Sequence, residues 1–522
     1  MKRLLITCLL LCASAFAPAQ TLRMAGQGDM QTLDPYSQNE SMTNMLNAQV
    51  YEFLIGRDRE LKLAPELAES WTQVSPLLWR FKLRAGVKFH DGTPFTADDV
   101  VFSFERAKLP TSQISVYANA TGTAKKIDPL TVEFSLKTFN PIFLQHVALI
   151  NIMSKRWCEE HRVTKPLDFT HGEESYATFN ANGTGPLVLV SRQPAIKTIY
   201  KRNPNWWGKY SGNVQNVVFT PIANDATRLA ALVSGAVDFV IDPAPRDLAQ
   251  LRRTEGVKIV EGPENRIVFI GLDQNRDKLL YGKAPGDKNP FKDIRVRRAL
   301  YQAIDIEAMK TKLMNGQSVP TGGLTAAASG AYDDPQIEAR LPFDLAAARK
   351  LMAEAGYADG FEFTLDCPNN RYINDEKICL ALASMWAQLK VKVRVNAIPR
   401  VTFFPKVDKM DTSAWMYGWG GAVTDAESIM TPVFRNRGEK GVGYYNYGWK
   451  DDKFDALAAQ SSTEIDPAKR EALVKAALLE FKQQIHVIPL HRQMIPWATR
   501  SNVTVVHRAD NWLRVEWVTV GP

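Results

Sequence analysis

The sequence has few cysteines and lacks the short motifs that mark common catalytic sites. Five cysteines occur among 522 residues and no two of them form a C-x-x-C pair, which argues against a zinc ribbon or a thioredoxin-like site. The motifs G-x-S-x-G, H-E-x-x-H and the P-loop are also missing. His486 and His491 lie in a predicted strand at a spacing that sends them to opposite faces, so they cannot share a metal ion. We therefore predict a protein that is not an enzyme and carries neither a cofactor nor a metal.

Long apolar runs are missing beyond the first residues of the chain. A basic start, Met1-Lys2-Arg3, precedes an apolar stretch from Leu4 to Cys12 and the small residues Ala17-Pro18-Ala19. These are the three parts of a secretory signal, and the stretch is shorter than the roughly 20 residues that a membrane span needs. We predict that residues 1–19 form a signal peptide, cleaved after Ala19, and that the mature protein is periplasmic.

Charge of one sign is not concentrated anywhere in the chain. The net charge is +8, which falls to +6 when Lys2 and Arg3 are removed with the signal, and basic residues are interleaved with acids. This distribution argues against a nucleic-acid partner. A hydrophobic content of 45% and a charged content of 23% are ordinary for a globular protein, and the length exceeds what one core holds.

Short strands and helices alternate along the mature sequence. Residues 79–83, 132–136 and 361–365 read as strands. Residues 98–108, with Thr96 as cap, read as a helix, as do 226–234, 346–354 and 467–484, whereas residues 282–287 read as a surface loop. The pattern predicts an interleaved α/β architecture of two lobes.

One block of the sequence is unusually distinctive. It reads L-A-P-E-L-A-E-S-W at 63–71, W-R-F-K-L-R-A-G-V-K-F-H-D-G at 79–92 and P-F-T-A-D-D-V at 94–100. Further matches follow in chain order at 33–35 (L-D-P), 183–186 (G-T-G-P), 203–208 (N-P-N-W-W-G), 230–238 and 295–300 (R-V-R-R-A-L). Together they resemble the extracytoplasmic solute-binding protein family 5, which serves dipeptide, oligopeptide and nickel importers.

The resemblance implies a fold and a division into domains. The fold is a periplasmic-binding-protein-like two-lobe clamshell with an extra domain. Lobe 1 is expected from residues 20–45, 183–270 and 485–522, the extra domain from 46–182, and lobe 2 from 271–484. Ligand is expected between the lobes, where its contacts with both favour the closed form.

The resemblance also implies a function. The chain is expected to be the monomeric substrate-binding component of an ABC importer, capturing a small solute, best a di- or oligopeptide with a carboxylate, and delivering it to the permease subunits. A receptor for a non-peptide solute or a metal chelate is the alternative, a role in chemotaxis stays open, and a hydrolytic enzyme is disfavoured. No cluster of histidines or cysteines supports direct metal binding.

The first candidate for ligand contact is Arg371, followed by Tyr372, in a loop after a predicted strand. Loops at the carboxyl ends of strands present ligands in α/β lobes, and a guanidinium fork suits a carboxylate. In dipeptide-binding relatives an Arg followed closely by Tyr has this role, although the Tyr spacing here differs by one residue. The alternative is a surface Arg paired with Asp375 or Glu376.

The second candidate region follows a predicted strand ending at Tyr417. Trp419 either stacks on the ligand or packs in the core, and Gly420 permits close approach of the backbone. In dipeptide-binding relatives an acid three residues after this Trp holds the peptide amine, but this position is Ala422 here. Either Asp425 replaces that acid, or the ligand has no free amine at this place; the alternative role for Asp425 is to cap a helix.

The remaining candidates are an N-terminal loop and a cysteine pair. Asp29 is an alternative partner for a cation, and Asp34-Pro35 in the same loop is expected to form a turn. Cys367 and Cys379 flank the Arg371 loop, and an oxidising periplasm favours a disulfide over two buried thiols. Cys158 is expected to be a buried small hydrophobe.

Overall fold

The computed structural model describes residues 20–325, 334–421, 423–439 and 441–521. The predicted signal peptide, residues 1–19, and the position of Ala422 lie outside the described residues. Within these ranges, no helix is both long enough and apolar enough to cross a membrane. Strands and helices alternate along the chain, which confirms the predicted α/β class.

The described chain forms helices and strands of widely varied length. The helices are α1 (Ser41–Asn47), α2 (Ala97–Ala107), α3 (Ser115–Asn119), α4 (Phe143–Val147), α5 (Lys155–Glu160), α6 (Tyr176–Phe179), α7 (Asp225–Val233), α8 (Leu248–Leu251), α9 (Ile294–Gln302), α10 (Ile306–Ala308), α11 (Pro335–Glu338), α12 (Leu345–Glu354), α13 (Asp375–Ala387), α14 (Arg400–Asp408), α15 (Glu427–Ile429), α16 (Asp452–Ser461) and α17 (Pro467–Gln484). The strands are β1 (Thr21–Gly26), β2 (Ile55–Arg57), β3 (Leu63–Pro65), β4 (Ala68–Ser75), β5 (Leu78–Leu83), β6 (Thr123–Asp128), β7 (Thr131–Ser135), β8 (Leu187–Gln193), β9 (Lys197–Arg202), β10 (Asn216–Pro221), β11 (Phe239–Ile241), β12 (Val257–Leu272), β13 (Gly282–Lys283), β14 (Ser318–Pro320), β15 (Glu362–Pro368), β16 (Lys392–Ile398), β17 (Ala414–Gly420), β18 (Val487–Arg500), β19 (Val503–Thr504) and β20 (Thr519–Val520).

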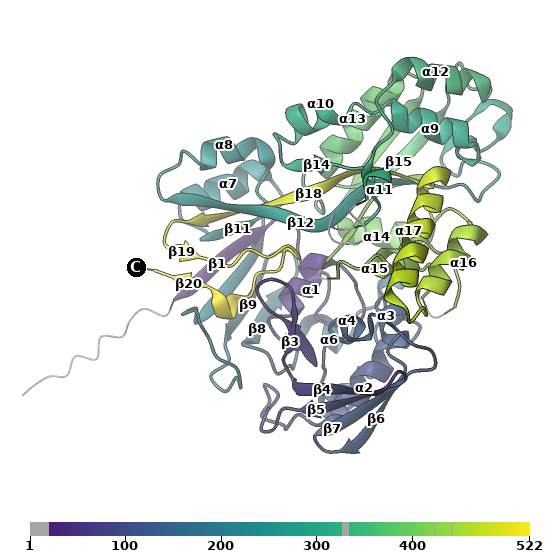
Figure 1. Ribbon diagram of the computed structural model, residues 1–522. Helices are drawn as coiled ribbons and strands as arrows, with labels where there is room; N and C mark the ends of the chain where they lie inside the picture. The colour runs from purple at the N-terminus through teal and green to yellow at the C-terminus, as the bar shows by residue number, and fades with distance from the viewer. Residues whose placement is uncertain (1–19, 326–333, 422, 440, 522) are drawn as a thin grey trace, which may run out of the picture.

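The largest sheet joins both ends of the molecule. Its strand order is β13-β15-β17-β12-β18-β11-β1-β10-β9-β8, with β16 beside β15 and β14 beside β18. The long strands β12 and β18 are antiparallel neighbours, and they run from the region of α7 and α8 to the region of α9 and α12 (Figure 1). The register of this pair shifts between Pro263 and Ile267, so the backbone hydrogen bonding between β12 and β18 is interrupted there.

Two of the predicted lobe boundaries fall at these long strands. β12 continues to Leu272, past the expected boundary at residue 270, and β18 begins at Val487, close to the expected boundary at 484. At the first boundary the chain therefore passes between the predicted lobes within one continuous strand, β12, whereas the second boundary falls just before β18. The division into three domains stays a prediction, because strand pairing alone does not delimit independent folding units.

A separate four-stranded sheet lies wholly within residues 46–182, the range predicted for the extra domain. Its order is β4-β5-β7-β6, and α2 lies beside it at the lower end of the molecule (Figure 1). Aromatic side chains pack between them, with the rings of Phe104 and Phe134 4.7 Å apart. The Thr96 hydroxyl and the Asp99 carboxylate form a capping box at the start of α2, as expected for the helix predicted over 98–108.

A buried ion pair ties the N-terminal loop to α2, within the range predicted for the extra domain. Asp34 accepts a hydrogen bond from the backbone N–H of Tyr36 at 3.2 Å, as in the turn that the sequence predicts. Its two carboxylate oxygens also bind Arg106 of α2 at 2.8 and 2.6 Å, and both side chains are fully buried. Arg106 donates further to the carbonyl of Val163 at 3.1 Å.

Most predicted elements appear within a residue or two of their expected bounds, and one needs correction. The helix predicted over 467–484 is α17, with the same bounds. Residues 282–287 were expected to be a surface loop, but Gly282 and Lys283 form β13, an exposed edge strand paired with β15. This pairing depends on a neighbour that lies some eighty residues further along the chain, so local composition did not reveal it.

Candidate functional site

A cavity lies where several distant segments meet. Its wall combines the loop before α13, the end of β17, the start of α1, the end of β2, the middle of β12 and the C-terminal residues 508–514. The expected lobes and the extra domain all contribute to it. Such enclosure by several parts of the chain is typical of a small-molecule site.

Arg371 and Tyr372 both line this cavity. They lie in the loop between β15 and α13, where Asp375 accepts hydrogen bonds from their backbone N–H groups at 2.8 and 3.0 Å. Burial raises the pKa of Asp375 to about 7, although these N–H groups favour its ionised form. The Tyr372 hydroxyl accepts a hydrogen bond from the Gly418 N–H at 2.7 Å, so this ring anchors the loop to β17.

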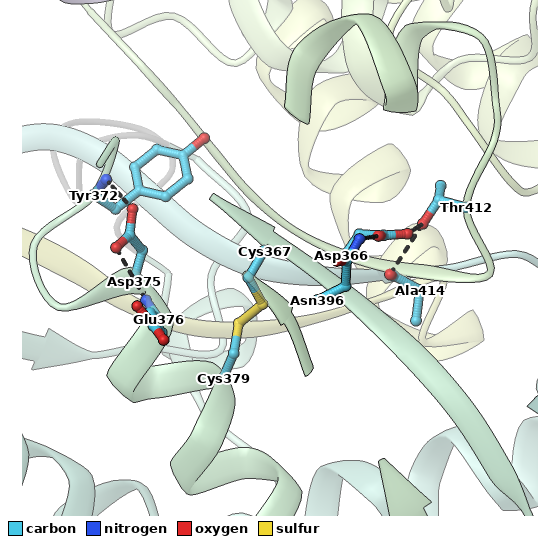
Figure 2. Close-up of a disulfide and its surroundings, with 9 residues drawn as sticks. All are labelled: Asp366, Cys367, Tyr372, Asp375, Glu376, Cys379, Asn396, Thr412 and Ala414. Atoms are coloured by element: carbon cyan, nitrogen blue, oxygen red, sulfur yellow. Dashed lines mark hydrogen bonds between the residues drawn. A yellow bond between two sulfur atoms is a disulfide. The ribbon is translucent and has the colours of Figure 1, made fainter. Parts of the chain in front are cut away.

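A disulfide clamps the base of the Arg371 loop. It joins Cys367, near the end of β15, to Cys379 in the second turn of α13 (Figure 2). Both side chains are fully buried. Cys158, a free thiol, is also buried, and burial raises its pKa to about 12.

Removing the disulfide is expected to destabilise the protein measurably. The bridge closes a loop with a sequence separation of 12 residues, so the double variant Cys367→Ala/Cys379→Ala should lose about 2–4 kcal/mol of unfolding free energy. Urea titration measures the loss. A reductant should destabilise the wild type but leave the double variant unchanged, and equal sensitivity of both proteins would contradict the assignment.

The Arg371 side chain reaches across to the start of the chain rather than to its own helix. Its Nε lies 2.9 Å from the Glu40 carboxylate, and Arg400 approaches the same carboxylate at 3.1 Å. This contact replaces the surface pairing with Asp375 or Glu376 that was the alternative. The guanidinium retains further donors on its terminal nitrogens, which suit a ligand carboxylate.

Glu40 is held in its ionised form by its surroundings. Burial opposes ionisation, but the charges of Arg400 and Arg371 and the backbone N–H groups of Thr43 and Met42 outweigh it, lowering the pKa to about 2. Arg400 also donates to the backbone carbonyl of Asp29. Glu40 therefore links predicted lobe 1 to two arginines of predicted lobe 2.

The low pKa of Glu40 predicts a specific dependence of stability on pH. A depressed folded-state pKa stabilises the fold above the ordinary value of 4.5, and this stabilisation is lost as the pH falls towards 2. Glu40→Gln should therefore be less stable than the wild type at pH 7, by about 3 kcal/mol, and the gap should narrow between pH 4.5 and 2. Urea titrations at several pH values measure the gap.

The matched control for this experiment is Glu69→Gln. Glu69 pairs with Lys82 on the exposed surface, where solvent screens the pair, so its removal should change stability far less than Glu40→Gln does. A gap between wild type and Glu40→Gln that stays constant from pH 7 to pH 2 would contradict the role given to this carboxylate.

Trp419 and Gly420 also line the cavity. The indole of Trp419 is 8% exposed, donates to the carbonyl of Ser428 at 2.7 Å and packs on Tyr445 with ring centres 4.9 Å apart. It is thus both a core residue and a wall of the cavity. Gly420 lies so close to β12 that a Cβ would approach the carbonyl oxygen of Asn265 to 1.8 Å, which explains the glycine.

Asp425 and Asp29 are not among the described residues that line this cavity, and their roles in ligand binding stay predictions. Asp425 binds both terminal nitrogens of Arg470 at 2.9 and 2.7 Å and accepts from the Glu427 N–H at the start of α15, whose N-cap is Ala426. Asp29 accepts from the N–H groups of Met30 and Ala195 at 2.8 Å. Both carboxylates satisfy nearby protein donors.

The sequence analysis missed four arginines of the cavity wall. They are Arg57, Arg266, Arg508 and Arg514. Three of them pair with an acid two positions away, in Glu264–Arg266 (2.7 Å), Arg508–Asp510 (2.5 Å) and Arg514–Glu516 (2.6 Å). This acid-x-Arg or Arg-x-acid spacing is visible in the sequence, but it does not reveal that the three pairs converge on one cavity.

Metal ligands do not gather in the part of the chain that the structure describes. No group of three or more His, Cys, Asp or Glu residues there could hold a metal ion. His486 binds Asp451 at 3.0 Å, and His491 is buried in β18. The contact of His486 and the burial of His491 suit structural roles for both residues.

Comparisons with known proteins agree with this architecture. The family profile described as "Bacterial extracellular solute-binding proteins, family 5 Middle" matches residues 62–441. The chain belongs to this solute-binding family. The predicted family is thereby confirmed, and a substrate-binding role with it.

Individual relatives extend the similarity to nearly the whole chain. Glutathione-binding protein GsiB from Escherichia coli is 27% identical over 506 residues, which cover 95% of this chain and 93% of that protein. The structure of DppA from Helicobacter pylori in complex with peptide STSA superposes with a TM-score of 0.84 at 20% identity, covering 96% of this chain and 98% of that one. HbpA2 from Haemophilus parasuis gives 0.69 at 25% identity, with coverages of 96% and 100%. These superpositions confirm the two-lobe periplasmic-binding-protein fold.

Proposed function

We propose that this family 5 protein is the periplasmic receptor of an ABC importer and captures a short peptide through a carboxylate bound to Arg371. The observation that carries the proposal is the position of Arg371, which lines the cavity from one lobe while its Nε contacts Glu40 of the other. A carboxylate at its terminal nitrogens would add a second bridge between the lobes and so favour the closed form.

The curated relatives suggest which peptide to try first. GsiB from Escherichia coli is glutathione-binding, and the similarity covers 95% of this chain. Glutathione is a tripeptide with carboxylates at both ends, which suits a cavity with several arginines. We propose glutathione as the first probe and linear di- and tripeptides as the second set.

The remaining parts of the proposal concern export and assembly. We propose that residues 1–19 are removed after Ala19, that the mature protein acts as a monomer without catalysis, and that its macromolecular partners are the permease subunits rather than nucleic acid. The interleaving of acids and bases over the sequence supports the last point. N-terminal sequencing of the exported protein checks the cleavage site.

Isothermal titration calorimetry combined with recovery of the probe tests the proposal. Protein purified from the periplasm and stripped of bound solute should bind glutathione or a linear peptide, and the probe should be recovered chemically unchanged. Conversion of the probe would indicate an enzyme. Binding of a metal chelate or a non-peptide solute, with no affinity for any peptide, would favour the alternative receptor.

A further inference from the structure

A second group of arginines lines the same cavity from segments other than the Arg371 loop. Arg57 ends β2, and Arg508 lies in the C-terminal segment after β19. The Asp510 carboxylate is fully buried, is bound to the Arg508 Nε at 3.1 Å and acts on Arg57 through its charge, which opposes the lowering of the pKa of Arg57 by burial. Arg57 donates to the Leu61 carbonyl at 3.1 Å and to the Gln145 side chain at 2.6 Å.

Both arginines retain buried donors that the protein does not satisfy. One terminal nitrogen of Arg508 and the Nε of Arg57 have no hydrogen-bond partner among the described residues. Arg508 is only 3% exposed, so bulk water contacts very little of this residue. Buried donors of charged groups nearly always have an acceptor in a folded protein. An acceptor from a bound ligand would complete this cluster.

The charges of the cavity wall also favour a bound anion. The carboxylates among its described residues are Glu40 and Asp510, and each is already paired with arginine. Burial lowers the pKa of Arg57 to about 10 against the opposing charge of Asp510, so this guanidinium is still protonated at neutral pH. A single carboxylate therefore serves two cations, and an anion placed beside them would be stabilised.

We propose that Arg57 and Arg508 form a second anion-binding subsite, so that the captured solute carries two acid groups, one at Arg371 and one at this subsite. The inference rests on the proposed function for the first acid group and adds the second. It names the substrate class as dianionic short peptides, such as those with an acidic side chain or a γ-glutamyl residue. A monocarboxylic peptide would leave the subsite donors unpaired.

The first test identifies the solute released by denaturing the protein as purified from the periplasm. Mass spectrometry with fragmentation counts its acid groups. A peptide with two acid groups supports both proposals. A peptide with one acid group supports the proposed function and overturns the second subsite. A non-peptide solute with two acid groups overturns the peptide part of the proposed function and supports the second subsite.

The second test uses defined probes and does not depend on a co-purified solute. Tripeptides that differ only by Glu or Gln, at each position in turn, are compared by calorimetry together with glutathione and its 4-aminobutyryl analogue, which lacks the γ-glutamyl carboxylate. The best acidic probe should bind about tenfold or more tightly than its neutral twin. Equal affinities within every pair would overturn the subsite, and no binding by any probe would overturn both proposals.

Variants assign the preference to the subsite. Arg508→Gln/Asp510→Asn removes both charges of the buried pair together, which avoids leaving a lone buried carboxylate, and Arg57→Gln removes the other cation. Each should reduce the ratio of affinities for the acidic probe and its twin towards one. Arg80→Gln, a surface arginine on the four-stranded sheet, is the control and should keep the wild-type ratio. A ratio that survives in both subsite variants overturns the proposal.

Discussion

Arg371→Ala is expected to weaken peptide binding by about 2–5 kcal/mol, or roughly 30-fold to several thousand-fold in Kd. The guanidinium lies against an enclosed cavity with its side chain only 10% exposed, so a ligand carboxylate left without it would be desolvated and unpaired. Calorimetry with the best-binding peptide measures the change.

Two comparisons separate recognition by Arg371 from a loss of folding. Arg371→Lys keeps the charge but loses the planar fork, so it should recover only part of the affinity. A peptide amidated at its carboxyl terminus should bind the wild type and Arg371→Ala about equally. Unchanged affinity of Arg371→Ala for the free peptide acid, with a wild-type melting temperature, would refute the assignment.

Asp34→Asn is expected to lower the unfolding free energy by about 3–5 kcal/mol. The substitution leaves Arg106 fully buried without its carboxylate, at the point where the N-terminal loop is tied to α2. Because Arg106 also donates a hydrogen bond to the Val163 carbonyl, the substitution should also weaken the packing within the predicted extra domain. Urea titration followed by tryptophan fluorescence measures it.

The control for Asp34→Asn removes both charges at once. Asp34→Asn/Arg106→Met should be markedly more stable than Asp34→Asn, because no lone charge stays buried. Glu133→Gln, which breaks the surface pair with Arg80, should cost less than about 1 kcal/mol. A loss for Asp34→Asn no larger than that for Glu133→Gln would show that the buried pair contributes little.

The sequence was most informative where structure depends on neighbours within one or two turns. The cap at Thr96 and the helix bounds Pro467–Gln484 follow from local hydrogen bonding and periodicity, and both appear as predicted. The pairing of Cys367 with Cys379 was favoured because the two lie close in sequence and the expected compartment is oxidising, and the structure joins them. The short strand β13 was missed because its partner β15 is distant in sequence.

The candidate site was only partly visible in the sequence. Arg371, Tyr372, Trp419 and Gly420 were found because they follow strands that end at the cavity, and the structure brings them together there. Asp425 was expected at the ligand because dipeptide-binding relatives have an acid three residues after the Trp, and Asp29 was an alternative cation partner in the N-terminal loop. In the folded chain, Arg470 and backbone N–H groups occupy their oxygens instead.

By itself, the sequence determined the α/β class, the solute-binding family and the loop that carries Arg371, because these depend on local patterns and on motifs in chain order. Only the tertiary structure decided which charges meet. Glu40 reaches Arg371, and Asp510 acts on Arg57 through its charge, in each case across hundreds of residues of chain. Ion pairs between distant segments depend on how the sheet and its lobes pack, and no periodicity or spacing in the sequence encodes that packing.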